Sequence, residues 1–95
     1  MSTPPSNRRL LSDAELCRAN GWTPGTVLEG RETVGRWWAE SQVRITAIGE
    51  QLVLARELKW RTSEDPEWKP VQRSETRWTF YERNWRVIES EDTTP

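Results

Sequence analysis

Four tryptophans, Trp37, Trp38, Trp60 and Trp68, form one set. Three of the four have a basic residue directly beside them, in Arg36-Trp37, Trp60-Arg61 and Trp68-Lys69, and Trp38 directly follows Trp37. These four tryptophans fall in segments that we expect to be loops or strand ends. An exposed indole beside a guanidinium can stack on a nucleobase and hold a phosphate. The same two residue types are enriched at the hot spots of protein–protein interfaces. The candidate partner- or ligand-binding residues are therefore Arg36, Trp37, Trp38, Trp60, Arg61 and Trp68.

The neighbouring pair Trp37-Trp38 has two interpretations. In an extended backbone successive side chains point to opposite faces, so both indoles cannot point inward. At least one ring then exposes a large apolar face, which is costly unless a partner covers it. The alternative is a loop that folds back and uses these rings as a lid over a small core.

The other three tryptophans fit positions in the core or at its edge. Trp22 lies between an expected helix and the first expected strand, Trp78 is in phase with Phe80 on one strand, and Trp85 leads into the last strand. The indole N–H of each is expected to reach a backbone carbonyl.

Most catalytic chemistry is missing from the composition. The chain has no histidine and one cysteine, which excludes an imidazole base, an internal disulfide and a Cys-rich zinc site. Neither a Gly-rich phosphate loop nor a nucleophile elbow occurs. We interpret Cys17 as a small half-buried side chain and the pair Glu89 and Glu91 as solvated. We expect no enzyme activity, no metal site and no cofactor.

The charge balance limits the class of partner. The chain has 14 basic and 15 acidic residues, so its net charge is −1, and its pI is about 5.5. A domain that binds long nucleic acid usually carries a basic footprint, which this chain lacks globally. A pocket for a small nucleotide needs only two or three arginines and one stacking tryptophan.

The chain divides into three parts. Residues 1–9 and 90–95 are small, polar and Pro-containing, so we expect a disordered lead and a disordered tail around one small β-rich domain at 10–89. No apolar run approaches the ~18 residues that cross a bilayer, and no signal peptide is recognisable. We expect a cytoplasmic protein without membrane contact. A core this small supplies only about 3–5 kcal/mol of folding free energy, so association into a homo-oligomer is an alternative source of stability.

A short helix is predicted near the start of the domain. Ser12 and Glu15 have the spacing of a capping box, and Asn20-Gly21 supplies a left-handed stop. Because two helical turns are not stable alone in water, the helix must pack on the rest of the domain. The residues expected to make this contact are Leu11, Leu16 and Cys17.

Five short strands follow, at residues 26–29, 42–48, 51–58, 75–81 and 86–89, with a long connection at 59–74. The pair 42–58 is predicted to be an antiparallel hairpin with Ile45, Leu52 and Leu54 buried. Its turn is placed at Gly49-Glu50, where the glycine suits a type II′ turn. The fold class is mainly β: a small SH3-like five-stranded antiparallel barrel with a short N-terminal helix. The alternative is an open antiparallel sheet with one helix packed across it.

Several short motifs resemble those of a group of small proteins encoded by bacteriophages of actinobacteria. They are Gly21-Trp22-x-x-Gly25-x-x-Leu28-x-Gly30, Val43-x-Ile45-Thr46-Ala47-Ile48-Gly49-Glu50, Val53-Leu54-Ala55-Arg56, Trp78 and Arg83-Asn84-Trp85. The resemblance covers residues 20–87 and transfers no activity or catalytic residue. It implies a protein that acts on the host or on host defence. The segment Arg36-Trp37-Trp38-Ala39-Glu40 departs from the group, whose corresponding loop lacks a Trp pair.

These observations favour a non-enzymatic phage accessory protein that binds a host or host-defence protein in the bacterial cytoplasm through an exposed Trp/Arg surface. The alternative is a sponge that captures a small, cyclic nucleotide immune signal. A nucleic-acid-binding module comes third, because glutamates interleave with the arginines.

Overall fold

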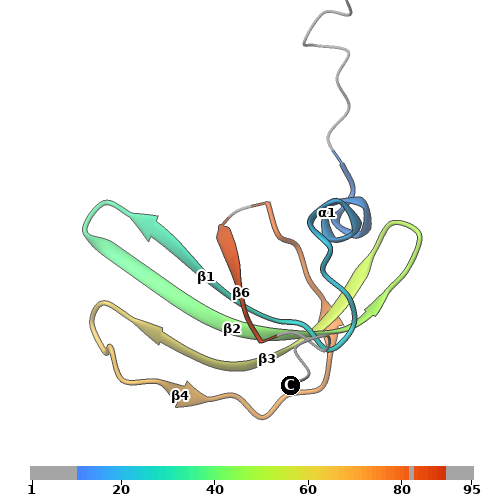
Figure 1. Cartoon of the computed structure of the whole chain (residues 1–95). Helices are drawn as coiled ribbons and strands as arrows, with labels where there is room; N and C mark the ends of the chain where they lie inside the picture. The colour runs from blue at the N-terminus through green and yellow to red at the C-terminus, as the bar shows by residue number, and fades with distance from the viewer. Residues whose placement is uncertain (1–10, 82, 90–95) are drawn as a thin grey trace, which may run out of the picture.

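The computed structural model describes residues 11–81 and 83–89, and within them the chain forms one six-stranded antiparallel sheet and one short helix (Figure 1). The predicted lead at 1–9 and tail at 90–95 lie outside these residues. The strands follow the order β4-β3-β2-β1-β6, and β5 also pairs with β3. The elements are α1 (Asp13–Asn20), β1 (Val27–Val34), β2 (Trp37–Ile48), β3 (Val53–Thr62), β4 (Lys69–Pro70), β5 (Thr76–Arg77) and β6 (Asn84–Glu89).

The fold is mainly β, as predicted, but the sheet stays open and the expected closed SH3-like barrel is not formed. β6 pairs with β1 at one edge, while the outer edge of β3 meets only the two-residue strands β4 and β5. The alternative of an open antiparallel sheet with one helix describes the structure. Figure 1 shows α1 and the connection from β5 to β6 over the same side of the curved strands β1, β2 and β3.

The helix begins as its sequence predicts. The Ser12 hydroxyl accepts from the Glu15 N–H at 3.1 Å, and the Glu15 carboxylate accepts from the Ser12 N–H at 2.8 Å. Gly21 ends the helix at φ 74°, in the left-handed region that glycine adopts without strain. Of the predicted packing residues, Cys17 is buried and Leu16 packs partly buried against the core, whereas Leu11 is exposed. Ala14, which was not predicted, is also buried.

The antiparallel hairpin of β2 and β3 is confirmed, and Ile45 is fully buried. The prediction that Leu52 and Leu54 are buried is wrong, because Val53 and Ala55 face the core instead. A register shift between Ile45 and Ala47 moves Leu54 to the outer face of the sheet. The predicted two-residue turn at Gly49-Glu50 is also wrong, since Ile48 pairs with Val53 across a four-residue connection.

A second hairpin, β1–β2, extends the predicted strands 26–29 and 42–48 through residues 30–41, which the sequence pattern left without strands. β1 does not end at Gly30 but continues to Val34, which pairs with Trp37. Gly35 has φ 61° and Arg36 has a negative φ, the combination found in a type II′ turn. The two long strands therefore carry Trp37 and Trp38 as strand residues, not loop residues.

The core lies between α1, the sheet and the β5–β6 connection. Its buried members are Ala14, Cys17, Leu28, Val43, Ile45, Val53, Ala55 and Phe80. The predicted core tryptophans Trp22, Trp78 and Trp85 are partly buried against it. Trp85 lies directly on Gly30, where an added Cβ would be 2.6 Å from the indole Cδ2, so this position requires glycine.

The C-terminal strands are shorter or shifted relative to the prediction. Only Thr76–Arg77 of the expected strand 75–81 pairs with β3, because the chain then leaves the sheet edge and brings Phe80 into the core. The expected connection 59–74 contains the end of β3 and the short strand β4. Among residues 11–81 and 83–89, no helix has the length and apolarity that a membrane span needs.

Candidate functional site

Trp37 and Trp38 point to opposite faces of the sheet. The register pairs Trp37 with Val34 and Trp38 with Thr33 across the hairpin. Directly paired residues share a face, and consecutive residues of a strand do not. The two indoles therefore belong to two separate surfaces.

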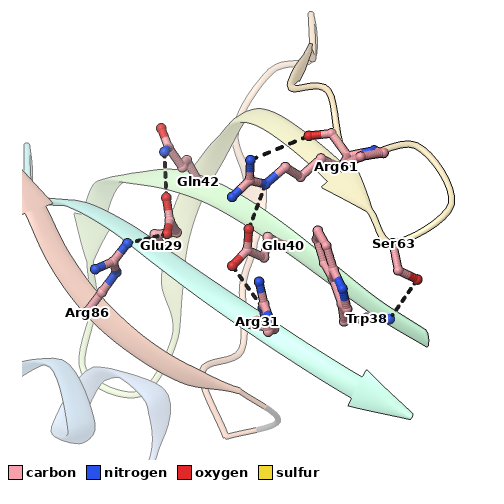
Figure 2. A network of polar contacts seen from close by, with 9 residues as sticks. Glu29, Arg31, Trp38, Glu40, Gln42, Arg61, Ser63 and Arg86 are labelled. Atoms are coloured by element: carbon pink, nitrogen blue, oxygen red, sulfur yellow. Dashed lines mark hydrogen bonds and ion pairs between the residues drawn. The ribbon is translucent and has the colours of Figure 1, made fainter. Parts of the chain in front are cut away.

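Trp38 lies on the face that carries a polar network, shown in Figure 2. Glu40 is buried, with 7% of its surface exposed. Its carboxylate accepts hydrogen bonds from Arg31 Nε at 2.9 Å and from Arg61 Nε at 2.7 Å. The Arg31 guanidinium lies 4.3 Å from the centre of the Trp38 ring, and the Arg61 guanidinium lies 4.3 Å from that of Trp68. We call Arg31, Trp38, Glu40, Arg61 and Trp68 the Glu40 cluster.

A second carboxylate on the same face extends the network. Glu29 accepts from Gln42 Nε2 at 2.8 Å and from Arg86 Nη2 at 2.6 Å (Figure 2). Partial burial acts to raise the pKa of Glu29, but these hydrogen bonds and the charges of Arg86 and Arg61 outweigh it and lower the pKa below 4.5. Arg31, Arg61 and Arg86 are thus held by carboxylates, and the first two also by indole rings.

Trp37 lies on the opposite face, beyond the part of the sheet that α1 covers. Val34 is 64% exposed, Trp37 37% and Trp60 39%. Trp60 shares this face because it pairs with Ser41, which lies two strand positions beyond Ala39 and four beyond Trp37. We call Val34, Trp37 and Trp60 the Trp37 surface.

The six predicted site residues are therefore divided. Trp38, Arg61 and Trp68 come together in the Glu40 cluster, Trp37 and Trp60 lie on the other face, and Arg36 is exposed in the turn. Arg31 and Glu40 were not predicted. The sequence feature that could have predicted them is the alternation of polar residues on both sides of Gly35-Arg36. This alternation pairs Arg31 with Glu40 only if a turn is placed at Gly35-Arg36.

A hollow of about 250 Å³ lies on the same side of the sheet as α1 and is lined by Arg77, Trp78, Thr79, Arg83 and Trp85. Trp78 and Trp85 meet edge to face, with ring centres 6.3 Å apart. The Arg83 guanidinium lies 5.6 Å from the Trp85 ring centre, and its Nη1 donates to the Ser41 hydroxyl at 2.9 Å. The sequence named Trp78 and Trp85 only as core residues and as parts of the motifs that carry the resemblance, and Arg83 only as part of such a motif. It did not predict a site here.

Residues 11–90 match a family described as a domain of unknown function, DUF7241. The chain belongs to this family. The matched range takes in α1 and every strand of the described residues. No curated protein and no solved structure matches the chain.

The cysteine of this DUF7241 domain is part of the core. Cys17 is fully buried, and burial together with the nearby charge of Asp13 raises its pKa to about 11. A reactive thiol needs a lowered pKa and access to solvent. The geometry of Cys17 provides neither. Within the described part of the chain, no three His, Cys, Asp or Glu side chains are grouped to hold a metal.

Proposed function

We propose that this domain is a non-enzymatic binding module that engages a protein partner through the Trp37 surface. The observation that carries this proposal is the direct cross-strand pair of Val34 and Trp37, both exposed on the same face as Trp60. A polar chain of this size leaves a Trp–Val pair at a hairpin end open to water only at a cost in free energy. A partner that covers it recovers that cost.

The backbone under the Trp37 surface suits recognition. Trp37 is a strand residue, and its neighbour Trp38 is fixed from the other face by the stack with Arg31 and by its backbone N–H, which donates to Ser63 Oγ at 3.1 Å. A rigidly mounted indole loses little conformational entropy when a partner binds. The hairpin end projects away from α1 (Figure 1), which leaves space for a partner.

The ion pairs of the polar face favour a protein partner over long nucleic acid. Arg31 and Arg61 share Glu40, Arg86 pairs with Glu29, and Arg44 lies 3.5 Å from Glu89. Cations already paired with carboxylates make a poor phosphate footprint. The resemblance to phage-encoded proteins makes a host or host-defence protein in the bacterial cytoplasm the partner class that we propose.

The test compares proteins retained from a bacterial lysate by three immobilised forms: the natural chain, Trp37→Ala and Leu52→Ser. Leu52 is 49% exposed in the β2–β3 connection, at the other end of β2, so it controls for losing an exposed apolar side chain. Thermal melting of each form checks that it is folded.

We expect a protein retained by the natural chain and Leu52→Ser and lost with Trp37→Ala. For the purified pair, Trp37→Ala should weaken affinity by about 2 kcal/mol, roughly 30-fold. Equal retention by all three forms would contradict the proposal.

A further inference from the structure

The hollow beside Trp85 combines cationic and aromatic walls. Two of its described lining residues are arginines and two are tryptophans, and none is a carboxylate. This differs from the Glu40 cluster, where each guanidinium already meets a buried carboxylate. A site with cations, ring faces and no lining carboxylate suits a ligand that is both anionic and aromatic.

The two arginines keep hydrogen-bonding capacity for a ligand. Arg77 is exposed on β5 and, among the described residues, has no side-chain hydrogen bond or ion pair. Arg83 donates to Ser41 and forms an ion pair with Glu32 at 3.7 Å, a distance longer than that of a hydrogen bond. A guanidinium carries five N–H donors, so both arginines can donate to further oxygens.

Trp85, one of the lining residues, also carries an unmet polar group. Trp85 Nε1 is buried, and within the described residues it has no hydrogen-bond partner. Buried indole N–H groups ordinarily find an acceptor, so a buried one without a protein partner calls for an explanation, of which a bound ligand is one. This is a second feature, independent of the arginines, that marks the same place.

We propose that this hollow binds a nucleoside monophosphate, with the phosphate held by Arg77 and Arg83 and the base against the indole rings. The volume of about 250 Å³ is at or below the lower end of small-molecule pockets, which suits one nucleotide unit rather than a dinucleotide. The site shares a face of the sheet with the Trp37 surface, since Arg83 donates to Ser41 and Ser41 pairs with Trp60, but the two have no residue in common. The proposal does not depend on the proposed protein partner.

The test is calorimetric titration of the full chain with adenosine 5′-monophosphate, and separately with adenosine and with inorganic phosphate. We expect saturable binding of the monophosphate and at least about tenfold weaker binding of each half. Equally tight binding of phosphate alone, or of adenosine alone, would overturn the proposal. So would the absence of heat with the monophosphate at millimolar concentration.

Matched variants locate the site. Arg77→Ala should weaken binding of the monophosphate about tenfold or more, because one charge-assisted contact is lost. Arg73→Ala removes an exposed arginine from the connection before β5, outside the lining residues, and should bind as the natural chain does. Arg77→Lys should retain part of the affinity. Equal binding by Arg77→Ala and Arg73→Ala would exclude this hollow.

A spectroscopic readout separates the ligand site from a general effect on folding. The chain has seven tryptophans, and the signal of each indole N–H can be followed in a ¹H–¹⁵N spectrum, with Trp85→Phe identifying that of Trp85. Adding the monophosphate should shift the Trp85 signal more than the Trp37 and Trp68 signals. A shift confined to Trp37 or Trp68 would contradict the proposal.

Discussion

Strand β2 passes through two regions that are packed in different ways. Near α1, Val43 and Ile45 are fully buried among apolar side chains. Toward Trp37, the same strand is fixed by Glu40 between two arginines and by Trp38 under Arg31. The outer half of β2 is thus ordered from its polar face, which leaves the Trp37 surface on the other face open.

The largest expected effect lies in the apolar region. Ile45→Ala should lower the free energy of unfolding by about 2–5 kcal/mol, because a fully buried side chain leaves a cavity. Leu54→Ala, on the neighbouring strand but 38% exposed, should cost less than about 1 kcal/mol. Chemical denaturation of both variants checks the difference. Equal losses of stability would mean that Ile45 and Leu54 are equally buried, contrary to the observed register.

A smaller effect is expected in the polar region. Glu40→Ala should lower the free energy of unfolding by about 1–3 kcal/mol, since it leaves Arg31 and Arg61 without their shared acceptor. Both arginines are partly exposed, which keeps the loss below that of a fully buried ion pair. Glu64→Ala, an exposed glutamate in the β3–β4 connection, is the matched control. A loss no larger than the control's would show that the outer half is not held by this network.

Acid should weaken the polar region selectively. Because the pKa of Glu29 is lowered below 4.5 in the folded chain, its hydrogen bonds stabilise the fold above that pH. This contribution is lost as the pH falls through the folded-state pKa. Urea denaturation from pH 7 to pH 3 should show a shallower acid loss for Glu29→Gln than for the natural chain. The same acid dependence in both would remove Glu29 from the explanation.

The smallest effect on stability is expected for Trp37→Ala. Because Trp37 is 37% exposed and is the first residue of β2, at the hairpin end, its removal should cost less than about 1 kcal/mol. Thermal melting beside Ile45→Ala gives the measurement. If Trp37→Ala instead melted the fold, the Trp37 ring would be a lid over the core and not part of a binding surface.

Local signals in the sequence predicted local structure. The Ser12–Glu15 capping box and the Gly21 stop depend on neighbours within one helical turn, and both are present. The β2–β3 hairpin was also predicted, but which leucines face the core was not, because the register shift at Ile45 has no clear sequence signature. The strand β1 was cut short at Gly30, since only the distant Trp85 explains a glycine inside a strand.

The candidate site was predicted in part for a similar reason. Adjacent Trp and Arg identified Trp38 and Arg61, which do meet in one cluster. Their shared carboxylate, Glu40, comes from strand pairing and could not be chosen from among the interleaved glutamates. The face of each ring likewise depends on the Gly35-Arg36 turn, which the pattern did not reveal.

The packing of Trp85 on Gly30 bears on the order in which the strands fold. The surface at Gly30 that Trp85 contacts exists only after β1 has formed. β1 is joined to β2 by a two-residue turn, whereas Trp85 is far from Gly30 in the sequence. Closing that long loop has an entropic cost that is recovered only when the ring docks. We therefore expect the two hairpins to assemble early and the C-terminal strand to join them last.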